Sequence, residues 1–509
     1  MLSLAALVLV FALMGCDSVN QPGQEDENSS SYIPELISPE NGAKFTQSTL
    51  FKWKGIRGVD TYRFQLGITN DFEEIIRDTL VNGRTFLENE LTEASQYHWR
   101  VKAVNQNSNR QWSASWVIYP PTDPIIDPID DFVRVENGKF TVGGEVLRFV
   151  GTNAYYLPNY EKINSGIVDN AFDSFEEAGI NVIRMWAFYD GYDCGYSQND
   201  PNENVIQTSP GVYSESALQD LDRVIAKGKE RNMRFILPFI NYWDELGGIC
   251  QYNTWAGAEN PGRNMDFFLN NEQTQQWYRD YIEMLLNRVN TVTGIAYKDE
   301  PAIMAWQIIN EGRNRQKQPE IIRDWYQEIA QFIKSIDSNH LVSTGEEGFD
   351  EGTPSQYSVG EYSNTYVLRA QEGTSYIMNT AIPEIDFGSA HWYPQDFGFG
   401  GTWNDNMKRA QEAWLTDHKN IANSFGKPFV LGEWGHHNWT DSSKKTMYNN
   451  LYQHAESIAL DGSMIWQLTA DGTKCWEFAG NICYPGGRND AELFNNFRNH
   501  VQAIRSMEN

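Results

Sequence analysis

The sequence predicts a (β/α)8 barrel preceded by a small all-β sandwich domain, and three observations lead to this fold class. Across residues 132–509, short apolar runs alternate with longer amphipathic stretches. Across residues 32–118, apolar and polar side chains instead alternate with a period of two. Residues 119–131 form a run rich in Pro and Asp between the two patterns, which we interpret as a linker because Pro is excluded from helix interiors and central strands.

The barrel prediction depends on eight apolar runs, because strands buried on both faces are continuously hydrophobic. These runs are Arg148–Gly151, Asn181–Arg184, Phe235–Phe239, Ala302–Ile308, Leu341–Thr344, Ile385–Ser389, Phe429–Leu431 and Ser463–Trp466. The helical stretches between them are Asp169–Ala178, Glu215–Glu230, Glu272–Val289, Ile321–Ile336, Met407–Ser424 and Thr446–Ala459. Eight strand–helix units predict one barrel with inserted loops. A doubly wound open sheet is the alternative, but no Gly-rich phosphate-binding sequence follows the first run.

Residues 1–16 read as an export signal, since their apolar run is too short to span a bilayer. The ending Leu13-Met-Gly-Cys16 resembles a bacterial lipobox, which implies cleavage before Cys16 and lipid attachment to its sulfur. An ordinary signal peptide with an incidental cysteine is the alternative. Residues 17–31 are polar and acidic, as in a flexible tether. We therefore expect a secreted protein or a cell-surface lipoprotein on the bacterial outer membrane, in contact with the membrane only through its lipid.

The segment 32–118 predicts a β-sandwich, because several half-buried strands are separated by turn signals. Two of its strands, around Trp53 and over Tyr97-His-Trp99-Arg-Val101, resemble those of a fibronectin type III module. Such modules act as spacers or bind ligands. We expect a spacer here, with glycan contact as the alternative.

The charge balance limits the partners. The chain carries 40 Lys and Arg against 68 Asp and Glu, a net charge of −28 at pH 7. Such a surface repels nucleic acid and anionic membranes but leaves an uncharged polysaccharide unaffected. The chain is expected to be a monomer without a cofactor.

Four cysteines follow Cys16, namely Cys194, Cys250, Cys475 and Cys483, and an even number in an exported chain indicates disulfides. Three pairings are possible. We expect Cys475–Cys483, which closes a short loop, and Cys194–Cys250, which joins two loops. No Cys-x-x-Cys pair occurs, and no His/Asp cluster has metal-ligand spacing, so the sequence predicts no metal site.

Polar residues close most of the predicted barrel strands, where barrel active sites lie. These residues are Asn153, Arg184, Asn310, Glu311, Glu346, Glu347, His391, Tyr393, Glu433 and Trp466. Glu311 and Glu433 end strands four and seven, nearly opposite each other, as the two carboxyl groups of a glycosidase must be. Glu346 and Glu347 are a rival pair, but neighbours on a strand point to opposite faces. Glu347 is instead expected to bind substrate on the leaving-group side.

Two segments carry a family resemblance. Trp306-Gln-Ile-Ile-Asn-Glu311 and Leu431-Gly-Glu433-Trp-Gly resemble the acid/base and nucleophile signatures of glycoside hydrolase family 5. Arg184, His391, Tyr393 and Trp466 fall where that family has its other active-site residues. The resemblance covers residue 132 to the C-terminus and implies a retaining, double-displacement mechanism.

Under this mechanism Glu311 acts as general acid and then base, with a pKa raised by the nearby carboxylate and by partial burial. Glu433 stays ionised as the nucleophile, held by Arg184 and by the hydroxyl of Tyr393. The two carboxyl groups of a retaining enzyme should lie about 5–5.5 Å apart.

Three further residues complete the expected site. Asn310 is expected to bind the substrate 2-hydroxyl, a contact that strengthens in the transition state. His391 is expected to orient Glu311 or Tyr393, and Trp466 to form the floor beneath the sugar. The alternative for both His391 and Trp466 is a role in core packing.

The loops narrow the substrate. Asn241–Trp255, Gly345–Gly348, Arg184–Trp186 and Phe267–Glu311 resemble the corresponding parts of endo-β-1,4-mannanases. The resemblance implies cleavage of mannan, glucomannan or galactomannan. It also implies substrate contacts by Trp186 and stacking platforms at Trp243, Trp255 and Trp392.

One motif departs from the mannanase pattern, and other function classes remain open. Many mannanases read Asn-Glu-Pro-Arg where this chain has Asn310-Glu-Gly-Arg313, so Gly312 is expected to shift the loop that carries the sugar-binding Arg313. A β-1,4-glucanase on the same machinery is one alternative. A non-catalytic surface lipoprotein that binds glycan is another, although both carboxylates are present. A structural or adhesion protein leaves the barrel unexplained.

Overall fold

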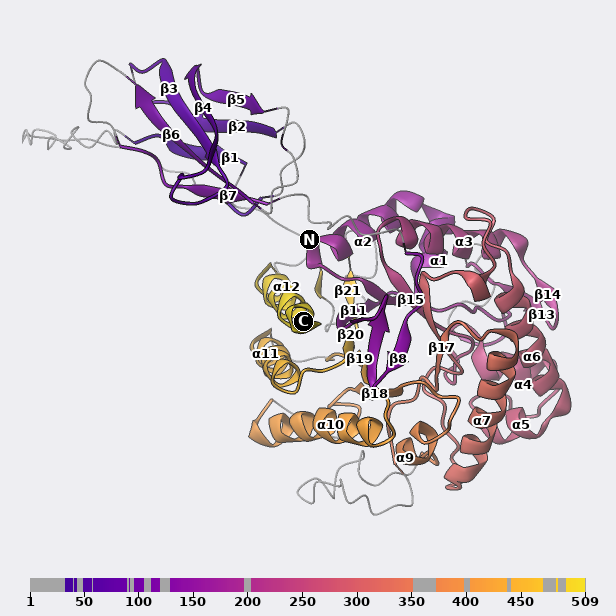
Figure 1. The fold of residues 1–509 in the computed structure, drawn as a ribbon. Coiled ribbons are helices and arrows are strands. Elements are labelled where there is room, and N and C mark those ends of the chain that lie inside the picture. Colours follow the sequence, from indigo (N-terminus) through magenta and orange to yellow (C-terminus); the bar gives the residue numbers. More distant parts are fainter. Residues whose placement is uncertain are drawn as a thin grey trace, which may run out of the picture. The chain divides into compact units, whose positions relative to one another are not determined.

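A computed structural model describes most of the chain, and Figure 1 shows the elements as labelled here. The described residues are 33–39, 41–43, 49–56, 58–88, 91, 96–104, 111–119, 129–195, 203–350, 372–397, 403–436, 441–469, 482–483 and 491–508. The chain divides into two compact units, Met1–Ile126 and Asp127–Asn509.

The described residues of the first unit form antiparallel strands in two sheets. One sheet has the order β1-β2-β5 and the other β4-β3-β6-β7. Their bounds are β1 Glu35–Ser38, β2 Thr49–Lys54, β3 Thr61–Gly67, β4 Ile75–Asn82, β5 Thr85–Glu88, β6 Tyr97–Val104 and β7 Trp116–Ile118. The period of two is clearest in β2 and β6, where every second side chain is buried. The buried faces supply one aromatic-rich core that includes Phe51, Trp53, Phe64 and Trp99.

The second unit is a (β/α)8 barrel, as predicted. Its eight parallel strands follow the order β17-β16-β15-β12-β11-β20-β19-β18, and the helices surround them (Figure 1). The strands are β11 Phe149–Asn153, β12 Val182–Arg184, β15 Arg234–Pro238, β16 Ile303–Gln307, β17 Leu341–Ser343, β18 Gly388–Trp392, β19 Phe429–Trp434 and β20 Gly462–Ile465. The N–H groups of Asp386, just before β18, and of His391 donate to the carbonyls of Val342 and of Glu347, just after β17, so the barrel is nearly closed.

All six predicted helices are present. They are α2 Ser165–Ala178, α3 Glu215–Glu230, α6 Glu272–Asn287, α7 Pro319–Ile336, α10 Asp405–Ser424 and α11 Asp441–Ser457. The sequence did not predict α1 Leu157–Ile163, α4 Gly248–Trp255, α5 Met265–Asn270, α9 Tyr376–Thr380 and α12 Ala491–Arg505. The remaining short elements are the strands β13 Gln207–Ser209, β14 Val212–Tyr213, β21 Leu468–Thr469 and β22 Ile482–Cys483 and the 3-10 turns η1 Tyr297–Asp299 and η3 Ser506–Glu508. Among the described residues, no helix has the length and apolar character needed to cross a bilayer.

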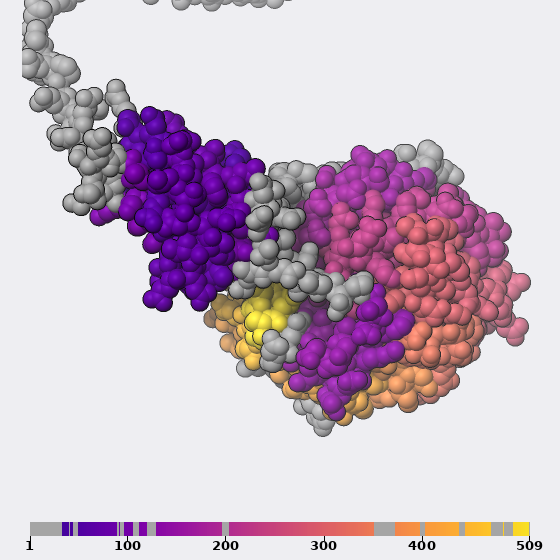
Figure 2. Space-filling model, turned by 45° about the horizontal axis from the view of Figure 1, so that its top comes forward, coloured from indigo at the N-terminus to yellow at the C-terminus, as the bar shows by residue number. Residues whose placement is uncertain are grey.

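A small antiparallel sheet, also not predicted, covers the N-terminal end of the barrel. It consists of β8 Arg134–Glu136, β9 Lys139–Val142 and β10 Glu145–Val146, and its residues form a purple patch on the surface in Figure 2. Phe140 contacts the rings of Phe149 and Phe387, and the three belong to an apolar cluster with the barrel interior. This end is therefore filled by apolar side chains, which leaves the C-terminal ends of the strands for polar chemistry.

The sixth strand begins later than predicted. The expected run Ile385–Ser389 is replaced by β18, Gly388–Trp392. Ile385 and Phe387 are fully buried but lie before the strand, so their apolar character reflects the core. The Asp386 carboxylate accepts a hydrogen bond from the Val342 backbone N–H, which ties this segment to β17.

A disulfide joins Cys194 and Cys250, with their Cα atoms 6.1 Å apart, and so links the segment after β12 to α4. Of the other expected pair, Cys475 lies outside the described residues, as does the side chain of Cys483.

Candidate active site

Glu433 lies on β19 with its side chain 6% exposed, and two donors hold its carboxylate. Arg184, at the end of β12, donates from Nη1 to Oε1 at 2.5 Å. Tyr393, just after β18, donates its hydroxyl to Oε2 at 2.8 Å. Both oxygens are thus engaged by donors that favour the ionised form.

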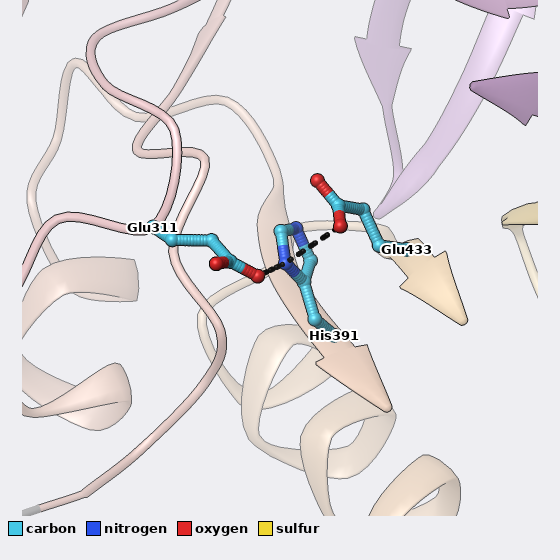
Figure 3. Close-up of side chains that lie close together, drawn as sticks. All are labelled: Glu311, His391 and Glu433. Carbon is cyan, nitrogen blue, oxygen red and sulfur yellow. Dashed lines mark hydrogen bonds and ion pairs between the residues drawn. The ribbon is translucent and has the colours of Figure 1, made fainter. Parts of the chain in front are cut away.

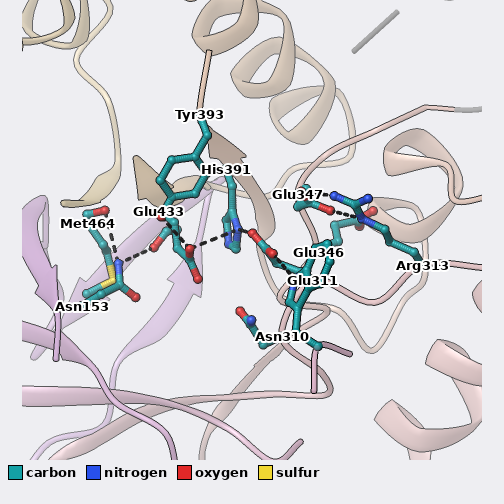
Figure 4. Close-up of polar contacts among 12 residues, drawn as sticks. Asn153, Asn310, Glu311, Arg313, Glu346, Glu347, His391, Tyr393, Glu433 and Met464 are labelled. Carbon is teal, nitrogen blue, oxygen red and sulfur yellow. Dashed lines mark hydrogen bonds and ion pairs between the residues drawn. The ribbon is translucent and has the colours of Figure 1, made fainter. Parts of the chain in front are cut away.

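Arg184 is fully buried and connects four barrel strands or their extensions. Its guanidinium donates to Gln307 at 2.6 Å, to Asn153 at 3.1 Å and to Asn310 Oδ1 at 2.7 Å, besides Glu433. Because a guanidinium presents its donors in a rigid fork, four acceptors around it fix its orientation. Figure 4 shows Asn153, Asn310 and Glu433 gathered in this region. Gln307 was not predicted, and its only signal is a polar residue inside an apolar run.

Glu311 lies beyond the end of β16 and has a left-handed backbone with φ +53°. Its N–H donates to the carbonyl of Gly345 at 2.9 Å, which connects it to the loop after β17. Trp243 donates its indole N–H to Oε2, and His391 Nδ1 lies beside Oε1, each at 2.5 Å. A left-handed non-glycine residue persists only where its surroundings determine it, and here three contacts do so.

The two carboxylates face each other across His391 (Figure 3). His391 Nδ1 lies 2.5 Å from Glu311 Oε1 and 3.7 Å from Glu433 Oε2. One oxygen from each carboxylate and the histidine nitrogen all lie within 4.8 Å of one another. Retaining glycosidases have carboxyl groups about 5–5.5 Å apart and inverting ones about 6.5–9.5 Å. The separation matches the retaining class.

Burial dominates the electrostatics of the pair. It raises the pKa of Glu311, against the lowering effects of Arg313, the Trp243 hydrogen bond and Arg184. Burial also raises the pKa of Glu433, which the Glu311 charge reinforces. Two carboxylates this close titrate as a unit, so the pair retains one proton to higher pH than either would alone.

His391, between the two carboxylates, and Tyr393, beside Glu433, are both neutral. Burial lowers the pKa of His391 to about 3, so its imidazole is uncharged at neutral pH. Burial and the nearby Glu433 raise the pKa of Tyr393 well above its usual value, so it remains a hydroxyl donor.

Arg313 and Glu347 are predicted substrate contacts that the structure pairs with each other. Arg313 donates from Nε and Nη2 to both Glu347 oxygens at 2.5 and 2.7 Å (Figure 4). Its Nη1 lies 3.0 Å from Glu372, and its guanidinium lies 4.9 Å from the centre of the Trp243 ring. Arg313 thus connects two carboxylates to the tryptophan that donates to Glu311. Glu372 was not predicted, since it follows a long stretch without a pattern.

Glu346 points away from this group into a separate buried cluster. Its carboxylate accepts hydrogen bonds from Thr344, Thr374 and Asn379. Burial raises the pKa of Glu346 to about 7, against these three donors. The two adjacent glutamates therefore face different surroundings, as expected from neighbouring backbone positions.

Three aromatic rings form a stack beside Arg184. Trp466 lies parallel to Tyr155 with ring centres 5.4 Å apart, and Trp186 contacts both. The Arg184 guanidinium lies 4.7 Å from the Trp186 ring centre. Trp466 is partly buried, which suits the predicted floor of a sugar site. Tyr155 was missed, although it lies two residues after Asn153, the last residue of β11.

The other predicted platforms differ from one another. Trp392 is 1% exposed and donates to Gln411, so it is a core residue and the prediction of a stacking platform there is wrong. Trp255 ends α4 and packs against Tyr252. Trp243 alone contacts the carboxylate pair, through its N–H edge.

Glycines shape the turn that carries Trp243. Gly247 and Gly248 have φ of +92° and +55°. A Cβ at Gly247 would lie 1.9 Å from the Asp190 carbonyl oxygen, and one at Gly248 would lie 2.3 Å from that of Asn241. Only glycine fits this approach, which places the loop after β15 against the segment after β12.

Within the described residues, Glu311, His391 and Glu433 are the group whose donor atoms could hold a metal ion. Arg184 already neutralises Glu433 at 2.5 Å, and a cation between the carboxylates would be repelled by this guanidinium. The donor set therefore fits acid–base chemistry better than metal binding.

The geometry and the fold define a glycoside hydrolase, and the chain belongs to the GH family 5 beta-mannosidase-like family, whose model matches residues 130–490. Mannan endo-1,4-beta-mannosidase 5 of Solanum lycopersicum is 35% identical over 375 residues, covering 70% of this chain and 85% of the relative. Mannan endo-1,4-beta-mannosidase 1 of the same plant is 33% identical and covers 68% and 85%.

Solved structures give the same family. The endo-β-1,4-mannanase of Thermotoga petrophila matches with a TM-score of 0.63 and 28% identity, over 72% of this chain and 78% of that one. The endo-1,4-β-mannanase of Rhizomucor miehei has a TM-score of 0.61 and 28% identity, over 74% and 99%.

Proposed function

We propose that this protein is a retaining endo-β-1,4-mannanase that cleaves mannan, glucomannan or galactomannan by double displacement. The observation that carries the mechanism is the short distance between the two carboxylates. One oxygen of Glu311 lies within 4.8 Å of one oxygen of Glu433, which leaves no room for the water that an inverting enzyme places between a carboxylate and the sugar. The names of the relatives support the substrate.

In the first step, Glu433 attacks the anomeric carbon while Glu311 donates its proton to the glycosidic oxygen. Arg184 and Tyr393 hold the Glu433 carboxylate in place and take up its charge in the free enzyme. A covalent glycosyl–enzyme bond forms, and the sugar on the leaving side departs with the proton from Glu311.

In the second step, Glu311 takes a proton from water, which attacks the same carbon and releases Glu433. His391 Nδ1 lies 2.5 Å from Glu311 Oε1, and its neutral imidazole, a weak base because it is buried, orients this carboxyl group. Asn310 retains one amide hydrogen beyond the one donated to Asn241, and we assign it to the substrate 2-hydroxyl.

Two measurements test this function. Wild-type protein should release reducing sugar from β-1,4-mannan, and Glu433→Ala should release at least about 10⁴-fold less. Proton NMR during hydrolysis should show the β-anomer of the new reducing end first. A first product in the α-form would refute retention, and release from carboxymethylcellulose but not from mannan would refute the substrate.

We also propose the domain boundaries of the sequence analysis: residues 1–16 as a lipoprotein signal, 17–31 as a tether, 32–118 as a fibronectin type III module and 119–131 as a linker to the catalytic residues 132–509. The proposal rests on the apolar run before Cys16 and on the strand patterns of the module. It places a monomeric enzyme at the cell surface, anchored by lipid on Cys16. Metabolic labelling with a radioactive fatty acid should mark the wild type but not Cys16→Ser.

A further inference from the structure

On the outer face of one sheet of the first unit, the aromatic ring of Trp112 contacts the charged side chains of Arg100 and Lys102. This face belongs to the sheet β4-β3-β6-β7, and Trp112 pairs with Lys102 of β6 across an antiparallel bridge. Paired residues lie on the same side of a sheet. Lys102 alternates with the buried Val101 and Ala103, so both it and Trp112 lie on the outer face.

Trp112 covers the cations of β6. The Arg100 guanidinium lies 4.4 Å from its ring centre and the Lys102 ammonium 4.9 Å. Both cations extend from the sheet, so the ring face that they contact is turned toward it. The Trp112 side chain remains partly exposed. Arg100 is fixed further by Phe72, at 3.8 Å from that ring centre.

Beside the ring lies a row of planar polar groups. Arg63 pairs with Asp78 through two hydrogen bonds, at 2.6 and 2.5 Å. Gln65 joins this pair to Arg100, donating to Asp78 at 2.8 Å and accepting from Arg100 at 2.8 and 2.9 Å. The Arg63 side chain is 45% exposed and that of Asp78 27%, so both offer free hydrogen-bonding edges.

Both outer faces of this unit expose aliphatic side chains. On the β4-β3-β6-β7 sheet Leu80 is 63% exposed directly opposite Arg63, and on the other sheet Ile37 is 51%, Leu50 41% and Leu87 50% exposed. The first face differs by its partly exposed indole ring and the polar side chains beside it. Leu50 and Leu87 are directly opposite each other on β2 and β5. A pyranose ring presents apolar C–H groups on its faces and hydroxyl groups at its rim. A flat ring bordered by fixed donors and acceptors matches both features, whereas aliphatic branches match neither.

We propose that this face, defined by Trp112, Arg100, Lys102, Arg63, Asp78 and Gln65, is a second polysaccharide-binding site that holds the β-1,4-mannan cleaved by the barrel. The choice of mannan rests on the proposed function. Arg63 and Asp78 neutralise each other, so this pair offers sugar hydroxyls both donors and acceptors without a net charge. Trp112 stacks on a sugar, and Arg63 and Asp78 bond its hydroxyls.

The experiment separates binding by this face from binding by the active site. Full-length protein carrying Glu433→Gln, so that polymer survives, is incubated with insoluble linear mannan, and the bound fraction is measured. Adding Trp112→Ala should weaken binding about 5-fold, since the stacking contact is lost. Trp112→Phe, which keeps a flat ring, should retain most of the binding. Leu87→Ala, on the opposite face, should leave it unchanged.

The same substitutions in the active enzyme control for damage. With soluble mannopentaose, Trp112→Ala should leave kcat/KM unchanged, while its rate on insoluble mannan falls. Equal binding of insoluble mannan by the Trp112→Ala protein and its parent would overturn the proposal, as would equal losses with Leu87→Ala. Trp112-dependent binding to cellulose and not to mannan would overturn the ligand. If wild type failed to cleave mannopentaose, the proposed function would fail, yet the binding comparison would still stand.

Discussion

Two buried histidine–carboxylate pairs lie at opposite ends of the barrel, in opposite surroundings. At the N-terminal end, ahead of β17, His340 Nδ1 lies 2.7 Å from Asp337 Oδ2, and its Nε2 lies 3.0 Å from the Glu300 carbonyl oxygen. Asp337 also accepts from the Trp306 indole at 2.8 Å and from two backbone N–H groups. Burial alone would raise the pKa of Asp337, but these donors outweigh it and lower the pKa.

The pair at the C-terminal end has fewer partners. His391 Nδ1 contacts Glu311, but Nε2 has no hydrogen-bond partner within the described part of the chain. The side chain of Glu311 remains 11% exposed, and burial raises its pKa. The two histidine–carboxylate pairs therefore have different functions. A carboxylate with all its donors in place holds its charge and stabilises the fold, whereas an incompletely satisfied one is ready to exchange a proton.

Activity should show the largest contrast between the two pairs. Glu311→Gln removes the transferable proton, so kcat/KM on mannan should fall about 10³-fold. Asp337→Asn, at the other end, should change it less than about 2-fold, because this residue lies far from the reacting groups. Initial rates of reducing-sugar release measure both. A comparable loss in the two variants would show that the N-terminal pair also governs catalysis.

Stability should show the reverse order. Asp337→Asn leaves buried donors poorly matched and should lower the free energy of unfolding by about 3 kcal/mol. The lowered pKa means that the Asp337 charge stabilises the fold above the unfolded-state pKa of about 3.9, and that this contribution is lost as pH falls through the folded-state value. Urea unfolding followed by tryptophan fluorescence should therefore show a smaller difference near pH 3 than at pH 7. A difference that does not depend on pH would contradict the proposed origin.

Removing the charge of Glu311 should instead stabilise the protein slightly. The raised pKa means that the folded state holds this carboxylate less well ionised than the unfolded state does, which costs stability at neutral pH. Glu311→Gln keeps the shape and should raise the midpoint of thermal unfolding by about 1–3 °C. The gain should shrink as the pH falls, because the wild-type carboxyl group then becomes neutral. A lower midpoint at neutral pH would show that the charge supports the fold.

The sequence predicted the residues at the C-terminal end of the barrel better than those at the N-terminal end. Buried parallel strands are continuously apolar, so all eight were visible, and the polar residues that follow them included Arg184, Glu311 and Glu433. The Asp337–His340 pair was missed because both residues precede a strand, whereas barrel active sites are expected among the residues that follow strands. Glu372 was missed because it follows a long stretch without a pattern, and its partner Arg313 comes from a distant loop.

The role of Trp243 shows a further limit. The sequence predicted an aromatic ring near the cleavage point and assigned its face to sugar stacking. The structure turns its N–H edge to Glu311, and the Arg313 guanidinium lies 4.9 Å from the centre of its ring. Residue type alone does not say which part of an indole is used.

The smallest expected effect tests this edge directly. The Trp243 N–H favours the ionised form of Glu311, so Trp243→Phe should raise the Glu311 pKa. Glu311 must be protonated to act as an acid, and the alkaline limb of the pH profile of kcat/KM should therefore move to higher pH. Trp255→Phe provides the matched control, since Trp255 packs on Tyr252, and it should leave the limb in place. If Trp243 acted only as a stacking platform, its replacement would raise KM and leave the alkaline limb unmoved. That result would support the stacking role that the sequence predicts for Trp243 and would indicate that His391, rather than Trp243, adjusts the pKa of Glu311.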